Sequence, residues 1–255
     1  SNKQELLSKV DRENIRKNSE LLEVRQSKKD DPNILPKVTV NDVGKSKSYP
    51  KSKIYISNGT KKNYYKAGTN GIDYYQAIHP IIKPTFDDLK YATLFADIMC
   101  EVGIKDKNYE DIQKLQSEIL GQISSNFTIL RDVNDSSFKL GIKMGGYSLQ
   151  SKTDEMKELI NETIENFRLD EIDRINEITK MHISGLEKSL TNAGHYFAMT
   201  SADAQMSLLG VISEISGGIS YLKNLKSLRL PDGNTDVQKL ISIFHNLKNK
   251  IVIKP

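Results

Sequence analysis

The chain has four histidines and one cysteine, so the chemistry that these side chains support can be checked residue by residue. They are His79, His182, His195, His245 and Cys100. No histidine begins an HExxH or HxxEH sequence, the spacings that place two imidazoles and a carboxylate around one zinc ion. A single cysteine can form neither an internal disulfide nor a cysteine-rich metal cluster. We therefore predict no catalytic, cofactor-binding or metal-binding residue here, with a metal site assembled from distant histidines as the alternative.

Two of the histidines lie on apolar helical patterns. His182 is four residues from both Ile178 and Leu186, which places it on or beside the apolar stripe of a helix. His245 follows Phe244 in a similar pattern. For both we predict a packed histidine in the core, whose ring nitrogens are satisfied by hydrogen bonds, rather than a ligand or a general base.

The other candidate residues also favour structural roles. His79 precedes Pro80, which predicts a turn, and Cys100 belongs to an apolar helix, which predicts a buried and unreactive thiol. The sequences GGYSLQSK and SGGISY match neither the phosphate-binding loop GxxxxGK[ST] nor GxGxxG. We expect Gly217 and Gly218 to break a helix or to let two backbones approach closely.

Composition limits the partners. The 255 residues include 37 basic and 33 acidic side chains, and the lysines are spread among acidic residues. This distribution is typical of a solvated surface rather than a nucleic-acid interface, which concentrates arginines and aromatic side chains. No apolar run reaches the roughly 20 residues that cross a bilayer. We expect a soluble, intracellular protein with no nucleic-acid or membrane partner, in a compartment that the sequence does not specify.

The elements expected around these residues alternate between strands and helices. Residues 3–29 have the pattern of a charged helix, which ends before Pro32 and Pro36. After a polar connector, three strands are expected in KIYISN, KKNYYKAG and NGIDYYQAI, followed by a strand pair at 122–131 and 136–144. Helices are expected in the following segments: 83–103, 108–121, a segment from Met156 to Phe167, a segment from Ile172 to Leu190, one helix within 192–225, and 236–249, before a short final strand IVIK.

These elements predict an α+β fold with an antiparallel sheet in one layer and helices on one of its faces, preceded by a linker helix. Alternating apolar residues mark the buried face of the sheet. They are Ile54, Ile56, Ile72, Phe138, Leu140 and Ile142.

Four segments resemble one family in their order and spacing. The first is SGLEKSLTNAGHYFAMTSADAQMSLLGVISEISGGISYLKNL, and the second is LLEVRQSKKDDPNILPKVTVNDV. The others are TNGIDYYQA and DDLKYATLFADIMCEVGIKDKNYEDIQKLQSEILGQIS. Together they resemble presequence proteases and falcilysin, a branch of the pitrilysin–insulinase zinc metallopeptidases. The matches cover nearly the whole chain.

The resemblance implies a metallopeptidase-half fold of the LuxS/MPP-like type. Residues 1–50 resemble the interdomain linker helix and connector, and residues 51–255 the non-catalytic associated domain of the second half. In that family zinc and its HxxEH ligands belong to the N-terminal catalytic half. This chain is then a fragment that needs no cofactor of its own. Its partners would be the catalytic half, the last domain of the same protein and the peptide substrate.

The resemblance thus implies a non-catalytic domain of an enzyme that degrades short unstructured peptides, forming part of a closed substrate chamber. The alternative is a stand-alone binding or assembly module that kept the fold without peptidase activity. We expect His195 to fix a turn or an interdomain contact in the chamber wall. The segment 194–221, which contains Gly217 and Gly218, is our choice for the most consequential surface or hinge element.

Overall fold

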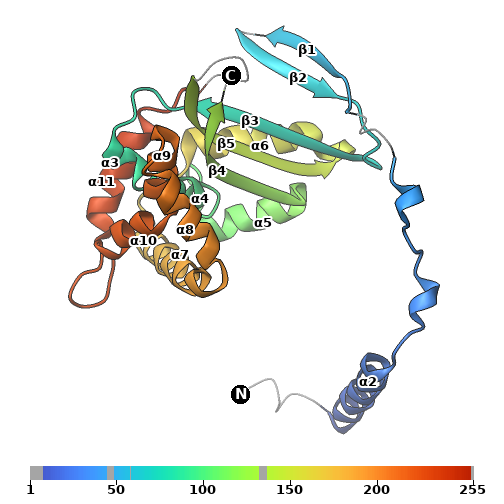
Figure 1. Ribbon diagram of the computed structural model, residues 1–255. Helices are drawn as coiled ribbons and strands as arrows, with labels where there is room; N and C mark the ends of the chain where they lie inside the picture. The colour runs from blue at the N-terminus through green and yellow to red at the C-terminus, as the bar shows by residue number, and fades with distance from the viewer. Residues whose placement is uncertain (1–7, 45–48, 58, 132–136, 254–255) are drawn as a thin grey trace. The chain divides into compact units, whose positions relative to one another are not determined.

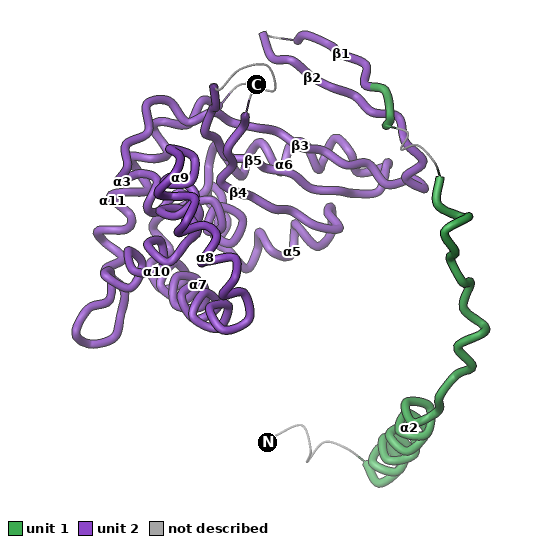
Figure 2. Tube along the Cα trace, viewed as in Figure 1, with its two compact units in different colours: residues 1–51 green, residues 52–255 purple. Residues whose placement is uncertain are grey.

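The computed structural model describes residues 8–44, 49–57, 59–131 and 137–253, and the chain divides into two compact units, residues 1–51 and 52–255 (Figures 1 and 2). The first unit contains helix α2 (Lys9–Ser27) and the short 3₁₀ helices η1 (Pro32–Ile34) and η2 (Val40–Asp42). The predicted helix at 3–29 is confirmed over 9–27, while its first apolar members, Leu6 and Leu7, lie outside the described residues.

Helix α2 begins at a capping box. The hydroxyl of Ser8 accepts a hydrogen bond from the backbone amide of Asp11, and the Asp11 carboxylate accepts one from the Ser8 amide. None of its residues is buried, and Val10, Leu21 and Leu22 are more than half exposed. The stability of α2 within its own unit therefore rests on local interactions, and its apolar side chains have no cover there.

The second unit is built on a three-stranded antiparallel sheet. Its strands are β3 (Ile72–Pro80), β4 (Gln122–Arg131) and β5 (Phe138–Leu149), in the order β3-β5-β4. Residue 72 pairs with 149 and residue 80 with 141 on one side of β5, while 122 pairs with 147 and 131 with 138 on the other. The predicted pairing of residues 122–131 with the following strand is confirmed.

The first two strands do not join this sheet. Strands β1 (Ser52–Ser57) and β2 (Thr60–Tyr65) pair only with each other, and β3 pairs with β5. The prediction that Ile54 and Ile56 belong to the buried face is wrong, because their exposures are 57% and 80%. A two-stranded ribbon has no second layer to cover its apolar side chains.

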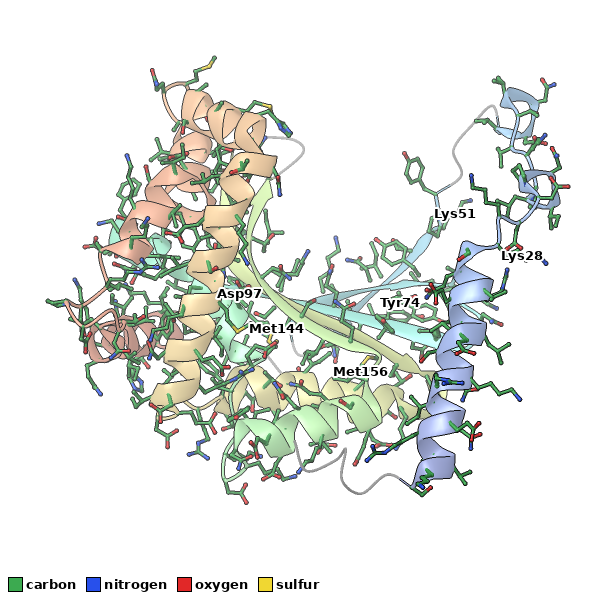
Figure 3. The ribbon with its side chains drawn as sticks, turned by 90° about the horizontal axis from the view of Figure 1, so that it is seen from below. Lys28, Lys51, Tyr74, Asp97, Met144 and Met156 are labelled. Carbon is green, nitrogen blue, oxygen red and sulfur yellow. The ribbon has the colours of Figure 1, made fainter. Side chains whose placement is uncertain are left out.

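Helices cover one face of the sheet. Helices α4 (Ala92–Met99), α5 (Tyr109–Ile119) and α6 (Thr153–Asn166) follow the strands, and Met144 and Met156 lie between the sheet and these helices (Figure 3). Both methionines are fully buried. Together with the antiparallel sheet, this confirms the predicted two-layer α+β fold, in which apolar burial on one face supplies the main driving force.

The expected helix at 83–103 is broken. It forms a single turn, α3 (Phe86–Leu89), and then α4, and Phe86 is 56% exposed rather than part of the buried face. The predicted capping pair is present: Thr85 accepts from the Asp88 amide, and the Asp88 carboxylate accepts from the Thr85 amide and hydroxyl. The break follows from a second function of Asp88, which anchors the end of the chain.

Asp88 is almost fully buried and ties the C-terminal segment to the start of the helical layer. Its carboxylate accepts hydrogen bonds from Lys250 at 2.5 Å and from Asn246 at 3.0 Å. Burial alone would raise the pKa of Asp88, but the bonds from Lys250 and Thr85 outweigh it and hold the pKa below its ordinary value. Residues 251–253 do not form the predicted final strand, since only an isolated bridge joins Ile81 to Ile251.

The C-terminal part is helical. Its helices are α7 (Ile172–Asn192), α8 (Gly194–Asp203), α9 (Leu208–Gly217), α10 (Ile219–Lys226) and α11 (Val237–Lys248). The single helix expected within 192–225 is therefore wrong, because that stretch forms three helices. Ser207 caps α9 by accepting a hydrogen bond from the Gly210 amide, and Gly218 separates α9 from α10.

Candidate functional site

The sheet leaves one face without helices. The even-numbered residues of β3 and β4 and the odd-numbered residues of β5 alternate away from the packed layer, and we call this set the open face. Three large side chains on it are well exposed: Tyr74 (67%), Ile78 (41%) and Leu149 (64%). The opposite face contributes Ile142 and Met144 to the core, at 0% exposure. An apolar and aromatic sheet face of this kind is a candidate binding surface.

A hollow of about 350 Å³ lies at one end of the open face. Its walls include Tyr74 and Tyr147, whose ring centroids are 5.5 Å apart and tilted by 41°. Gly145 forms part of the lining, and a Cβ atom added there would lie 2.9 Å from the backbone oxygen of Tyr75. The close approach of two backbones thus requires glycine, and the absence of a side chain leaves the space between the rings open.

Polar side chains border this hollow. Gln76, Gln122 and Ser124 line it, and the amides of both glutamines make no hydrogen bond to any residue that the structure describes. Each glutamine amide can donate and accept hydrogen bonds, as a peptide backbone requires. The hollow contains no nucleophile, general base or metal ligand set, so its chemistry is that of binding.

The charge of the open face has one sign. Lys139 and Lys143 are its only charged residues, and Asp73, the one carboxylate on the three strands, belongs to the packed face. There Asp73 accepts a hydrogen bond of 2.7 Å from the hydroxyl of Thr153. The open face therefore combines aromatic rings, free amides and uncompensated positive charge.

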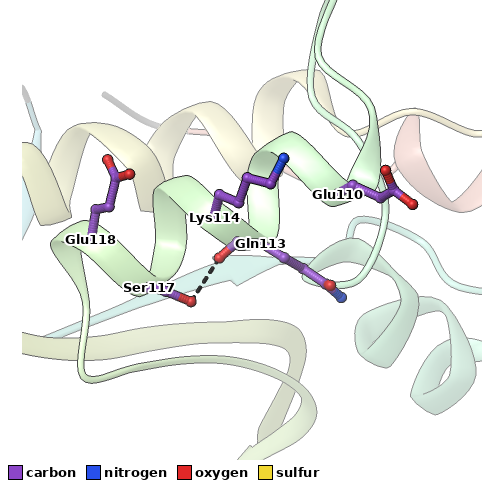
Figure 4. A pocket seen from close by; sticks show the side chains of 5 residues that line it. All are labelled: Glu110, Gln113, Lys114, Ser117 and Glu118. Atoms are coloured by element: carbon purple, nitrogen blue, oxygen red, sulfur yellow. Dashed lines mark hydrogen bonds between the residues drawn. The ribbon is translucent and has the colours of Figure 1, made fainter. Parts of the chain in front are cut away.

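A second depression lies along α5 (Figure 4). All of its lining residues belong to this one helix: Glu110, Gln113, Lys114, Ser117 and Glu118. Ser117 donates a hydrogen bond to the backbone oxygen of Gln113, as helix serines commonly do. Because no other element contributes side chains, these groups do not converge on a ligand.

His182 occupies the role expected of it. Its Nδ1 atom lies 3.1 Å from a carboxylate oxygen of Asp97, and its Nε2 atom lies 2.9 Å from the hydroxyl of Tyr221. Tyr221 is buried, and burial together with the charge of Asp97 raises its pKa well above the ordinary value. The hydroxyl is thus held in its neutral form, and the three side chains connect α4, α7 and α10 as a structural hydrogen-bonded chain.

The other histidines differ from their predicted roles or stay apart from one another. His79 lies inside strand β3 rather than in a turn, because its side chain belongs to the packed face; burial lowers its pKa, although a backbone hydrogen bond with Val252 opposes this. His245 is exposed on α11 instead of packed in the core, because the helix turns Phe244 inward. His195 lies exposed on α8. Among the described residues, no group of three histidine, cysteine or acidic side chains could hold a metal ion.

Cys100 is buried at the end of α4, as predicted. Burial raises the pKa of its thiol to about 12, helped by the charges of Glu101 and Asp97. The thiolate, which is the reactive form, is therefore scarce at neutral pH.

The two adjacent glycines have different environments. Gly217 ends α9, and a Cβ atom added there would meet no atom within 4 Å. One added at Gly218 would lie 2.0 Å from a carboxylate oxygen of Glu214. That carboxylate is buried and accepts hydrogen bonds from the Ser220 amide, at the start of α10, and from the Ser201 hydroxyl of α8. Glu214 thereby joins α8, α9 and α10, a role that sequence analysis did not identify.

The architecture is that of an α+β domain with a binding face and no catalytic centre in its described part. The sequence matches the family described as "Peptidase M-16C associated" over residues 1–228, and the chain belongs to this family.

Individual relatives agree. The mitochondrial presequence protease of Drosophila melanogaster is 25% identical over 97% of this chain and 24% of its own length. That of Saccharomyces cerevisiae is 27% identical over 96% and 25%, and the protein HypA of Clostridium perfringens is 24% identical over 92% and 25%. The resemblance to presequence proteases is confirmed, and the chain spans about a quarter of the length of these relatives.

A solved structure supports the fold alone. The crystal structure of a conserved protein from Enterococcus faecalis V583 matches 80% of this chain and 52% of its own, with a TM-score of 0.50 and 10% sequence identity. No described helix has the length and hydrophobicity that crossing a membrane requires.

Proposed function

We propose that this chain is the non-catalytic associated domain of a zinc metalloendopeptidase that degrades short unstructured peptides. The observation that carries the proposal is the match to the peptidase-associated family over residues 1–228, in a chain that spans a quarter of presequence proteases. The zinc and the groups that activate water belong, in this proposal, to the N-terminal half of the same protein. The described residues of this chain supply no ligand set, so no chemical step is assigned to them.

The proposal divides the chain at residue 50. Residues 1–50 act as the interdomain linker and residues 51–255 as the associated domain. The uncovered apolar side chains of α2 support a partner outside this chain, since Val10, Leu21 and Leu22 have no cover within their own unit. The partners are the catalytic half and the last domain of the same protein.

The open face is our candidate for the surface that the chamber presents to the peptide. Tyr74 and Tyr147 offer aromatic contact area, and Gln76 and Gln122 offer unused amides that can pair with a peptide backbone. A wall that holds an extended peptide raises the rate of a remote reaction by positioning, because small misplacements of a scissile bond reduce the rate severely.

The test compares two tyrosines in the full-length enzyme. Tyr74→Ala removes an open-face ring, and Tyr196→Ala removes a ring of similar exposure from α8 (67% and 49% exposed). We expect the first substitution to lower kcat/KM for a ten-residue peptide about tenfold, equivalent to roughly 1.4 kcal/mol of binding energy, and the second to change it little. Zinc content should be unchanged in both.

Unchanged kcat/KM in Tyr74→Ala would remove the open face from the proposal. Chelator-sensitive cleavage of peptides by the 255-residue chain alone would contradict the assignment of catalysis to other domains. A gene product without any upstream HxxEH segment would favour a stand-alone binding module instead.

A further inference from the structure

We infer that the open face selects peptide segments in which an aromatic residue is accompanied by carboxylates. This inference rests on the proposed function and adds a substrate class to it. The aromatic side chain would occupy the hollow beside Tyr74 and Tyr147, and the carboxylates would face Lys143 and Lys139.

The first support is the absence of acid on this surface. Strands β3, β4 and β5 carry one carboxylate among them, that of Asp73, and it is turned to the packed face and bonded to Thr153. Within the described part of the chain, neither Lys139 nor Lys143 has an ion-pair partner. A positively charged segment laid on this face would meet repulsion with no compensating group, whereas a negatively charged one would be attracted.

The second support is the spacing along β5. Tyr147, Gly145 and Lys143 are successive residues of the open face, so neighbouring members are separated by about 7 Å along the strand. An extended peptide has the same two-residue repeat. A peptide that runs along β5 with an aromatic residue over Gly145 therefore brings the side chain two residues away to Lys143. The strand geometry thus sets the pattern as aromatic and acidic residues two positions apart.

Other occupants fit less well. A second copy of the same face would bring Lys143 and Lys139 against like charges, which disfavours self-association. Nucleic acid shares the negative charge of an acidic peptide, but the open face contains no arginine to make forked phosphate contacts. An acidic, aromatic peptide uses the hollow, the amides and the lysines together.

The test uses two fluorescent eleven-residue peptides on the 255-residue chain. Both have a central phenylalanine in a Gly/Ser background, and one carries glutamate and the other lysine at the positions two before and two after it. Fluorescence anisotropy at low salt should give a Kd for the glutamate peptide about 3–10-fold lower than for the lysine peptide, the size expected of one or two exposed ion pairs. The difference should shrink as salt is added.

Charge reversal identifies the surface. Lys143→Glu should reverse the preference between the two peptides, and Lys188→Glu, an equal charge change on an exposed position of α7, should leave it intact. Equal affinity for the two peptides, with binding still lost in Tyr74→Ala, would overturn the charge inference and leave the proposed function standing. Binding of neither peptide, together with unchanged kcat/KM of full-length Tyr74→Ala, would remove both. Tighter binding of a twelve-nucleotide RNA, equally sensitive to Lys143→Glu, would overturn the peptide assignment.

Discussion

Gly218→Ala should destabilise this protein, whereas Gly217→Ala should not. The β-carbon of alanine at 218 would lie 2.0 Å from Oε2 and 2.6 Å from Cδ of Glu214, so the carboxylate has to leave its position. A glutamate side chain can swing aside, so the steric part is small. The larger effect is the loss of the two hydrogen bonds that Glu214 accepts, from the Ser220 amide at 2.9 Å and from the Ser201 hydroxyl at 3.1 Å.

The magnitude follows from these two bonds. Hydrogen bonds to a charged group contribute about 1.5–3 kcal/mol each, and part of this is recovered when the carboxylate reaches water. We expect Gly218→Ala to lower the free energy of unfolding by about 2–4 kcal/mol, with a fall in Tm of about 5–12 °C for a domain of this size. At Gly217 a Cβ enters open space, and because alanine is the better helix former, the change should be neutral or stabilising by up to about 1 kcal/mol.

A double-mutant cycle tests the cause. Each variant is unfolded with urea and followed by circular dichroism. Glu214→Ala alone should destabilise the chain by about 2–3 kcal/mol, because it removes the same two hydrogen bonds. In that background Gly218→Ala has no carboxylate to displace, so its additional effect should be below about 1 kcal/mol, a coupling of about 2 kcal/mol. Equal destabilisation by Gly218→Ala in both backgrounds, or equal effects at 217 and 218, would refute the reasoning.

Three further substitutions or treatments have defined outcomes. Because the pKa of Asp88 is lowered in the folded state, its contribution to stability is present above its unfolded pKa of about 4 and is lost as pH falls through the folded value; urea titrations from pH 7 to 3 should show this loss, and Asp88→Asn, which also leaves Lys250 without its ion-pair partner, should flatten it. Cys100, with its pKa at about 12, should react with a thiol reagent at pH 8 only after unfolding, so prompt reaction of the native chain would contradict its burial. Gly210→Ala places a Cβ 2.2 Å from the backbone oxygen of Asp203, which cannot swing aside, and should lower the free energy of unfolding by about 1–3 kcal/mol or more in the same urea assay.

Local signals predicted the elements that local interactions determine. The helices α5, α6 and α7 follow the spacing of their apolar residues, and the capping box of Thr85 and Asp88 was visible as a pair three residues apart. Strand β5 followed from the alternation of Phe138, Leu140, Ile142 and Met144. In each case the periodicity of one segment was sufficient.

Errors occurred where distant segments decide the outcome. Ile54 and Ile56 alternate as a buried strand does, but burial requires a second layer, and no pattern within 52–57 reports whether one exists. The split of 192–225 into three helices depends on the Ser207 cap and on Glu214 reaching the start of α10. His79 preceded a proline and was assigned to a turn, although Pro80 is the last residue of a strand, where a missing amide hydrogen is tolerated.

The open face was missed for a related reason. Its members are alternate residues of three strands, and the sequence separates Tyr74 from Tyr147 by two helices and a strand, so only the register of β3 on β5 makes them neighbours. One signal was available without the structure: residues 72–80, 122–131 and 138–149 contain a single acidic residue, in a chain where acidic residues number 33. Strand pairing turns that bias into one basic surface, because the lone aspartate falls on the packed side. A search for catalytic residues discards such a signal, whereas a search for a peptide-binding wall depends on it.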